Sequence, residues 1–314
     1  MNWKEDKILI TGGTGMVGAC FVKRLKSLGC NVVSSGYTRG DFKYNLMSSF
    51  ETESLFERVQ PDIVIHCAAK VGGIFANMRN KADMYFENTL INTNVMVEIQ
   101  KRKVEYVMAM GTGCGYPKRL EGIRLYEEDY LDGLPEVTND AYAYAKRNLL
   151  VNLQACNEQY KLNYCYCILA NLYGENDNFH STESHVVPAL VRKFVEAKRK
   201  NEPQVPLWGS DGKAMRDFLY VEDLVDAMIL MLEKNVFGAI NIPSGHSTTI
   251  LGLARLLKDI TGYKGEIVFD DRFPEGQHVR LFDNSKVMKL GWCPKHDLRQ
   301  GLQKTVTWFE NLER

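Results

Sequence analysis

The stretch that most constrains the fold is the glycine-rich segment TGGTGMVG at residues 11–18, which follows a short apolar run and opens a helix-like run. In a strand–loop–helix unit, Gly12 permits the tight turn, Gly15 lets the backbone approach a pyrophosphate, and Gly18 lets the helix pack on the strand. The N-terminus of the helix then offers free N–H groups to the phosphates. The segment therefore predicts a dinucleotide site; the alternative is a mere glycine-rich turn.

Short apolar runs alternate with helix-like runs through the first half of the chain. The expected strands are 7–11, 30–35, 62–68, 105–110 and 164–170, and the expected helices are 15–28, 82–101 and 140–160. Such alternation implies parallel βαβ units, and nearly continuous apolar strands are typical of a sheet covered on both faces. The sequence predicts an α/β fold, a doubly wound parallel sheet (Rossmann) with a smaller C-terminal α/β substrate lobe.

The alternation breaks after about residue 174, where a polar, turn-rich stretch (172–184) precedes another helical run (185–200). We expect a Rossmann domain formed by 1–174 and completed by 217–245. The smaller lobe would then consist of 175–216 and 246–314.

The charge balance and the cysteine pattern exclude several classes of protein. Lys plus Arg and Asp plus Glu each number 39 in 314 residues, which argues against a general nucleic-acid binder. No apolar run approaches membrane-spanning length, and the first residues lack the layout of a signal peptide. The eight cysteines are scattered without zinc spacing. We expect a cytoplasmic protein with free thiols and no metal, nucleic-acid or membrane partner.

The end of the second expected strand bears on the choice of cofactor. An NAD site usually has a carboxylate there for the ribose 2′-OH, whereas this chain has Ser34 and Ser35, with Arg39 nearby. A carboxylate would repel a 2′-phosphate, which Ser and Arg suit, so the sequence favours NADP(H). The alternative is that Arg39 is a solvated loop charge.

A candidate carbonyl-reduction centre follows from three residues. Tyr142 and Lys146 are spaced i, i+4 and share one face of an expected helix. A neighbouring ammonium and an oxidised nicotinamide favour the phenolate, so the phenol becomes a usable acid–base near neutrality. Thr112 follows the strand 105–110 and so points into the crevice where open α/β sheets bind ligands. The three would hold a ketone oxygen while Tyr142 supplies its proton; the alternative is two exposed helix residues.

Eight segments spread almost from end to end carry a more specific signal. They are TGGTGMVG, HCAAKVGGIFAN (66–77), CGYPK (114–118), AYAYAK (141–146), NLYGENDNFH (171–180), SHVVPAL (184–190), WGSDGKAMRDFLYVEDL (208–224) and LGWCP (290–294). They resemble the GDP-L-fucose synthase family of extended short-chain dehydrogenase/reductases, and the VGGI, DNF and SHV pieces are particular to that family. The resemblance implies an NADP-dependent oxidoreductase that converts GDP-4-keto-6-deoxymannose to GDP-L-fucose by epimerising C3 and C5 and then reducing C4.

The resemblance also assigns roles to individual residues. It implies that Cys114 and His185 are the base and acid of epimerisation, although a lone cysteine is usually a core residue and a lone histidine a satisfied hydrogen-bonder. The implied cofactor contacts are Gly12, Thr14, Gly15, Met16, Val17, Gly18, Arg39, Asn45, Ala68, Ala69, Lys146 and His185. The implied contacts to the GDP-sugar are Asn171, Val186, Lys193, Trp208, Arg216 and Arg280. The Arg216 fork suits a diphosphate and Trp208 offers a flat face, the alternative for Trp208 being a core position.

Several positions depart from the family pattern. The usual Ser-Ser-Cys reads Thr112-Gly113-Cys114, and Gly113 with Gly115 would make this loop slimmer or looser. The family's Arg-Lys after its Pro-Asp-Gly turn reads Val279-Arg280 after PEG (274–276), and Asn45 stands where an acidic residue is expected near the adenine.

These departures keep other functions open. One alternative is a C4 reductase without epimerase activity, acting on a GDP-6-deoxy-4-keto-heptose in surface polysaccharide synthesis. A remote alternative is a non-catalytic dinucleotide sensor, which the retained Tyr142 and Lys146 disfavour. The family also implies a homodimer packed through the helices 82–101 and 140–160.

Overall fold

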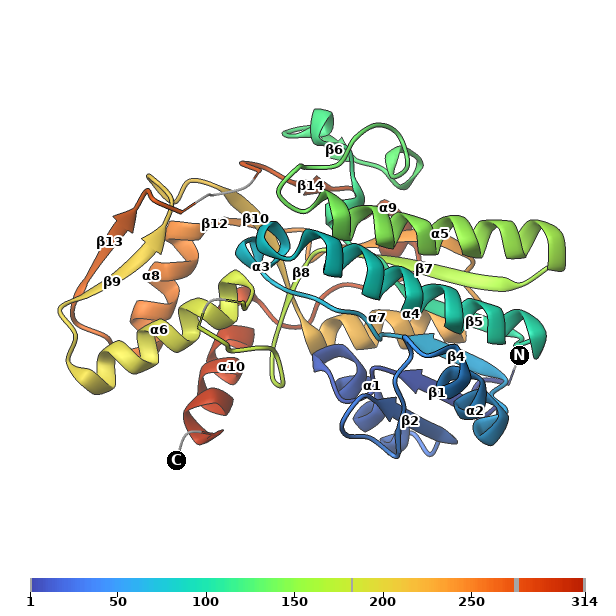
Figure 1. Ribbon diagram of the computed structural model, residues 1–314. Helices are drawn as coiled ribbons and strands as arrows, with labels where there is room; N and C mark the ends of the chain where they lie inside the picture. Colours follow the sequence, from blue (N-terminus) through green and yellow to red (C-terminus); the bar gives the residue numbers. More distant parts are fainter. Residues whose placement is uncertain (1, 182, 274–276, 313–314) are drawn as a thin grey trace.

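A parallel sheet of seven strands forms the larger part of the computed structural model, which describes residues 2–181, 183–273 and 277–312 (Figure 1). The strand order is β11-β7-β5-β4-β1-β2-β3, and every neighbouring pair is parallel. The strands are β1 (Ile8–Thr11), β2 (Val32–Gly36), β3 (Phe42–Lys43), β4 (Ile63–His66), β5 (Tyr106–Met110), β7 (Asn163–Leu169) and β11 (Gly238–Ile242). The chain starts at β1 and winds outward in both directions, so the predicted doubly wound sheet is confirmed.

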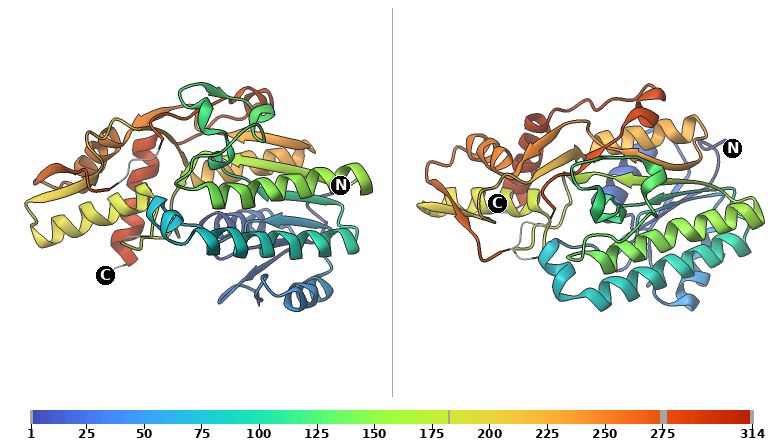
Figure 2. Two further views of the ribbon diagram at one scale, coloured as in Figure 1. Left: turned by 45° about the horizontal axis from the view of Figure 1, so that its top comes forward. Right: turned by 90° about the horizontal axis from the view of Figure 1, so that it is seen from above.

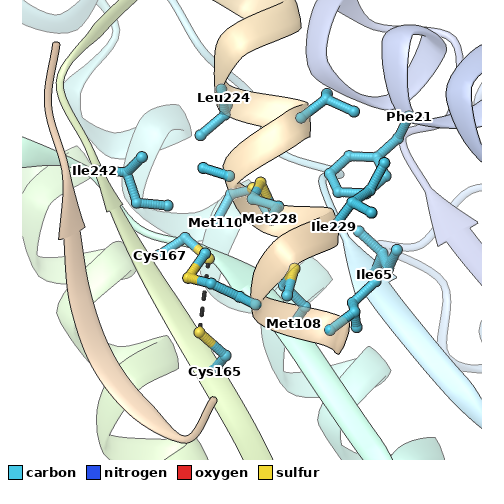
Figure 3. Packing of buried hydrophobic residues seen from close by; sticks show 14 of the residues in the cluster. Phe21, Ile65, Met108, Met110, Cys165, Cys167, Leu224, Met228, Ile229 and Ile242 are labelled. Carbon is cyan, nitrogen blue, oxygen red and sulfur yellow. Dashed lines mark hydrogen bonds between the residues drawn. The ribbon is translucent and has the colours of Figure 1, made fainter. Parts of the chain in front are cut away.

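Helices cover both faces of this sheet because successive strand residues point to opposite sides. Ile8 and Ile10 of β1 pack in one core with α1 (Met16–Ser27) and α7 (Val221–Glu233). Leu9 packs in the opposite core with α2 (Ser49–Val59), α4 (Lys81–Lys101) and α5 (Asp140–Tyr160). Figure 3 shows part of the first core, where Met110 and Met228 lie close together between the strands and α7. Burial on both faces explains the nearly continuous apolar character of the strands.

The smaller part of the molecule lies to one side of the large sheet (Figure 2) and has a third apolar core. Its helices are α6 (Val186–Lys200), α8 (Ile250–Thr261) and α10 (Leu298–Leu312), which pack on one another. Its strands are β8 (Asn171–Tyr173), β9 (Gln204–Trp208), β10 (Met215–Tyr220), β12 (Ser247–Thr249) and β13 (Glu266–Asp270). They form a sheet of order β12-β10-β8 and a separate β13-β9 pair.

A parallel pair of short strands joins two distant segments beside the large sheet. β14 (Leu281–Phe282) pairs with β6 (Arg124–Leu125), which belongs to the long loop between β5 and α5. The remaining helices are α3 (Ile74–Arg79), just before α4, and α9 (Ser285–Lys289), just after β14. The β14-β6 pair brings the C-terminal segment near residue 280 to the turn that follows β5.

The strands and helices expected in the first half of the chain all occur, with ends that differ by one or two residues in most cases. Helix α2 was not expected, and neither was the short strand β3. The PEG turn at 274–276 lies outside the described residues. Within the described part of the chain, no helix combines the length and the apolar character that crossing a membrane requires.

Candidate active site

One cavity of about 940 Å³ lies across the carboxyl ends of β1, β4, β5 and β7, and α6, β9 and β10 form its other wall. This edge is where the strand order reverses, and it is the usual ligand site of an open α/β sheet. The residues predicted above for catalysis, cofactor or substrate line this cavity, except Ser34, Ser35 and Arg39. Arg39 is exposed in the loop between β2 and β3.

The glycine loop between β1 and α1 leaves room for a ligand at Gly15, one of its four glycines. Gly12 has a positive φ of 66°, and a Cβ there would lie 2.6 Å from the Ala68 backbone nitrogen. A Cβ on Gly18 would lie 2.2 Å from the Gly12 carbonyl oxygen, whereas one on Gly15 would meet only that oxygen, at 3.6 Å. Gly15 is also the N-cap of α1 and gives it no side-chain cap. The first N–H groups of α1 are therefore available to an anion in the cavity.

The end of β2 differs from the prediction. Ser34 and Ser35 are buried and do not line the cavity. The Ser34 backbone N–H and hydroxyl both donate to the Asp41 carboxylate at 2.8 Å. The Ser34 side chain is therefore paired with Asp41. Tyr37 and Asn45 form this part of the cavity wall instead.

Tyr142 and Lys146 lie on the first two turns of α5, with the Lys146 nitrogen 5.9 Å from the centre of the tyrosine ring. Lys146 is only 2% exposed and donates to the Met110 carbonyl oxygen at 2.9 Å. Burial lowers its pKa to about 8, with an opposing contribution from Cys67. The expected lowering of the pKa of Tyr142 by Lys146 and an oxidised nicotinamide stays a prediction. Burial raises that pKa, and the nearby Cys114 and Tyr130 add to the effect.

A buried hydrogen-bond chain ties α5 to the centre of the sheet. Thr11 donates its hydroxyl to Nδ1 of His66 at 2.7 Å, and Nε2 of His66 donates to the Asn92 side-chain oxygen at 3.1 Å. Asn92 on α4 then donates to the Ala145 carbonyl oxygen of α5 at 3.1 Å. Burial and the Lys146 charge lower the pKa of His66 to about 4, so the ring is neutral. Because Nε2 donates to an amide oxygen, Nδ1 must be the nitrogen that accepts. It fixes the turn of α5 that carries Lys146.

The turn after β5 presents a thiol to the cavity. Thr112 caps the short 3-10 turn Gly113–Gly115 by accepting from the Cys114 N–H at 3.2 Å. The Cys114 sulfur accepts from Nδ2 of Asn139 at 3.2 Å and from a guanidinium nitrogen of Arg280 at 3.5 Å. Burial raises the pKa of this thiol, but Arg280, the Thr112 hydroxyl and Arg216 together outweigh it, and the net shift is downward. The thiolate is the form that can act as a base.

His185 lies on the opposite wall, as the N-cap of α6 with no capping hydrogen bond from its side chain. Asp177 lines the same wall, and one of its buried carboxylate oxygens has no partner among the described residues. Burial raises the pKa of Asp177, and the nearby His185 opposes the rise. An acid and a carboxylate thus lie together on this side of the cavity.

An aromatic stack marks the far end of the cavity. Trp208 lies face to face with Phe273, with ring centres 4.5 Å apart and planes 10° apart. The Lys193 nitrogen is 5.2 Å from the Trp208 ring and donates to the Pro206 carbonyl oxygen at 2.8 Å. Trp208 is partly buried and lines the cavity, so it is not a core tryptophan. Arg216 lines the same region.

Comparisons with known proteins agree with this arrangement. A model of the NAD dependent epimerase/dehydratase family matches residues 8–242. GDP-L-fucose synthase 1 of Arabidopsis thaliana is 38% identical over 311 residues, which cover 98% of this chain and 94% of that protein. The chain belongs to the GDP-L-fucose synthase family.

Two solved structures resemble the chain over nearly all of both lengths. A GDP-6-OMe-4-keto-L-xylo-heptose reductase from C. jejuni has a TM-score of 0.90 and 28% identity, covering 98% of this chain and 99% of its own. A GDP-L-fucose synthetase from Naegleria fowleri bound to NADP has a TM-score of 0.87 and 29% identity, covering 99% and 94%.

The structure accounts for the departure of the cysteine loop from the GDP-L-fucose synthase pattern. A Cβ on Gly113 would lie 2.4 Å from the Phe282 ring, and one on Gly115 would lie 2.1 Å from the Tyr130 ring. The loop is slimmer, as expected, but the two rings fill the space that the missing side chains leave. It is therefore packed and not loose.

Two residues were missed in the sequence: Asn139, which contacts the sulfur, and Gln277, which contacts Arg280. Asn139 stands directly before a helix, where asparagine is expected as a cap, and that ordinary explanation concealed its contact with Cys114. Gln277, which accepts from Arg280 at 2.6 Å, carries no recognisable signal. The Asn139–Cys114 contact joins residues 25 apart, and Gln277 acts through Arg280, which meets Cys114 across 166 residues.

Proposed function

We propose that the protein is an NADPH-dependent reductase that acts at C4 of a GDP-4-keto-6-deoxy sugar, after epimerising C3 and C5 in the same cavity. The names of its relatives and of the NADP-bound structural neighbour support this. One observation carries the proposal. The glycine loop, the Tyr142–Lys146 pair, the Cys114 sulfur and His185 all line one cavity, although they come from four distant segments.

The residues at the glycine loop fit NADP(H). Gly15 leaves the approach to the N-terminus of α1 open, and the neighbouring wall is formed by Ala68 and Asn45. When bound, NADPH supplies the hydride for the reduction. Lys146 would hold the cofactor beside Tyr142, and the remaining cofactor contacts predicted above, including Arg39, stay predictions.

The reduction itself needs a proton donor at the ketone oxygen. Tyr142, whose pKa is raised by burial, stays protonated at neutral pH and can donate that proton. Thr112 would hold the same oxygen through its hydroxyl, since both residues line the same cavity. A developing negative charge on the oxygen is thus met by two donors.

The epimerisation uses the same oxygen. C3 and C5 flank the C4 ketone, so a proton on either carbon is acidified by it. The Cys114 thiolate takes that proton and becomes a thiol, while the electron pair moves to the ketone oxygen as an enolate held by Tyr142 and Thr112. His185 returns a proton to the other face of the carbon. One oxygen site therefore serves both epimerisations and the reduction.

The remaining substrate contacts would lie around the aromatic stack. Arg216 and Lys193 would hold the diphosphate, and Trp208 would hold a flat ring. Asn171 and Val186 would contact the sugar near His185. We also propose that residues 1–174 with 217–245 bind the cofactor, while 175–216 and 246–314 bind the GDP-sugar.

We further propose a homodimer through α4 and α5, which run side by side (Figures 1 and 2). Both helices expose large apolar residues, among them Phe86, Leu90 and Val97 on α4 and Tyr144 and Val151 on α5. An apolar face of this kind is typical of a protein interface. The cytoplasmic location and the lack of nucleic-acid or membrane partners stay predictions.

A second candidate is a C4 reductase without epimerase activity, acting on a GDP-linked 4-keto-heptose. It is favoured by the similarity to the heptose reductase structure, at a TM-score of 0.90.

Supplying GDP-4-keto-6-deoxy sugars of six and seven carbons, each with NADPH or NADH, tests the proposal. We expect NADPH to be oxidised with the six-carbon sugar, and NMR of the product to show inverted C3 and C5. Oxidation of NADPH with the seven-carbon sugar alone would favour the second candidate. No oxidation with either sugar would contradict both.

A further inference from the structure

We propose that Arg280 and Asn139 hold Cys114 as a thiolate, and that Gly113 makes this possible by admitting the Phe282 ring that positions Arg280. This inference deepens the proposed function and rests on it for the use to which the thiolate is put. It assigns Arg280 to the reacting sulfur and not to the GDP-sugar, where the sequence placed it.

The sulfur receives two donors. Nδ2 of Asn139 lies 3.2 Å from it and a guanidinium nitrogen of Arg280 lies 3.5 Å from it. Arg280 is oriented by a second contact, because its Nε donates to the side-chain oxygen of the buried Gln277 at 2.6 Å. Donors and a positive charge beside a thiol stabilise its ionised form.

The segment carrying Arg280 is fixed on both sides. The His278 carbonyl oxygen accepts from the Met215 N–H of β10 at 2.7 Å. The Asp283 N–H donates to the Leu125 carbonyl oxygen of β6 at 3.0 Å. Arg280 therefore approaches Cys114 on an anchored strand and not on a free loop.

Gly113 allows this approach. Residues 280 and 282 are two apart on an extended segment, so their side chains leave it on the same side. The Phe282 ring packs against Gly113, where a Cβ would lie 2.4 Å from the ring. A serine at 113, the family's usual residue, would push the ring away and move Arg280 with it. The glycine and the arginine are thus parts of one arrangement.

The groups that face Cys114 act in opposite directions. Burial disfavours the thiolate, whereas Arg280, the Thr112 hydroxyl and the more distant Arg216 favour it. The phenols of Tyr142 and Tyr130 also face the sulfur, and the negative charge on Cys114 helps to raise both of their pKa values. The two arginines are positively charged, whereas the phenols are neutral. The net charge facing the sulfur is therefore positive, which favours the thiolate.

The experiment measures the thiolate directly, without substrate or NADPH. The rate at which iodoacetamide alkylates Cys114 is followed by peptide mass spectrometry from pH 5 to 10, in the wild type and in Arg280→Met. We expect the midpoint of the wild type to lie below the ordinary thiol value of about 8.5, and Arg280→Met to raise it by about one pH unit or more. Arg280→Lys, which keeps the charge, should restore part of the shift.

Two further variants probe Asn139 and Gly113. Asn139→Asp replaces a donor with a carboxylate of the same shape and should raise the midpoint. Gly113→Ser should raise it as well, by displacing Phe282. Arg24→Met, on the outer surface of α1 where it pairs with Asp226, is the matched control and should leave the midpoint unchanged.

The outcomes separate this inference from the proposed function. A midpoint that Arg280→Met leaves unchanged overturns the inference, and a higher KM for the GDP-sugar in that variant would then return Arg280 to the substrate. Bound NADPH fluorescence shows that each variant is folded. If the midpoint shifts but the wild type oxidises no NADPH with any GDP-keto sugar, the thiolate arrangement stands and the proposed function fails.

Discussion

At the scale of single residues, the reduction depends on a phenol and an ammonium that are both buried. Burial lowers the pKa of Lys146 to about 8, and its nitrogen donates to the Met110 carbonyl oxygen. Tyr142 is held in its protonated form by burial. The pair therefore suits proton donation to a ketone better than proton removal from an alcohol.

Replacing Tyr142 with Phe tests this assignment. The change removes the donated proton and leaves the ring, so kcat for NADPH oxidation should fall by about 10²-fold or more. The affinity for NADPH, measured by fluorescence titration, should stay within about threefold of the wild type because the glycine loop is untouched. A variant that retains more than about a tenth of the activity would show that another group supplies the proton.

At the scale of secondary-structure elements, the glycines of the loop between β1 and α1 have two different roles: close packing and space for a ligand. A methyl group on Gly18 would collide with the Gly12 backbone, whereas one on Gly15 would reach only ordinary contact distance. Gly18 allows α1 to pack against β1 and its loop, and Gly15 leaves space for a ligand.

The variants Gly15→Ala and Gly18→Ala should therefore differ in kind. Gly18→Ala should lower the free energy of unfolding by about 1–3 kcal/mol, the usual cost of overpacking. Gly15→Ala should leave stability within about 0.5 kcal/mol and weaken NADPH binding about tenfold or more. Urea denaturation and fluorescence titration of both variants measure this, and equal losses of stability would contradict the assignment.

The hydrogen-bond chain through His66 predicts a loss of stability in acid. The unfolded chain takes a proton at His66 near pH 6.5, while the folded protein takes it only near pH 4. Between these values the unfolded state binds more protons, so the free energy of unfolding falls as pH falls. At about 1.4 kcal/mol per pKa unit the contribution is about 3 kcal/mol.

The matched variant is His66→Gln, which removes the titrating group. Its free energy of unfolding should be lower than that of the wild type at pH 7, and the difference should shrink by about 3 kcal/mol between pH 6.5 and 4. Urea denaturation across this range provides the measurement. Parallel curves of the free energy of unfolding against pH for the two proteins would contradict a lowered pKa of His66 in the folded state.

At the scale of the whole molecule, the outer face of α4 and α5 should join two subunits. Phe86→Asp and Val151→Asp place charges on that face and should convert the dimer to monomer in sedimentation velocity. Phe50→Asp, on α2, is the control because Phe50 is more exposed than either residue, at 75%, but lies on another helix. A wild type that sediments as a monomer would remove the proposed interface.

The sequence predicted the fold well because local signals agreed with it, but it predicted the electrostatics of the site poorly. The βαβ alternation placed the strands within a few residues, and Thr112, Tyr142 and Lys146 line the same cavity. Helix α2 was missed although Ser48 and Glu51 form the S-x-x-E signature of a helix start. The Arg280–Cys114 contact spans 166 residues and the burial of Tyr142 depends on the complete fold, so no local pattern contains either.

The central claim is that one ketone oxygen in this cavity serves both proton exchange at the neighbouring carbons and reduction. Incubating the wild type in D₂O with NADPH and GDP-4-keto-6-deoxymannose, and locating deuterium in the product by NMR, tests it most directly. The account predicts deuterium at C3 and C5, and at C4 the protium of the cofactor. A reduced product with no deuterium at C3 or C5 would contradict the claim.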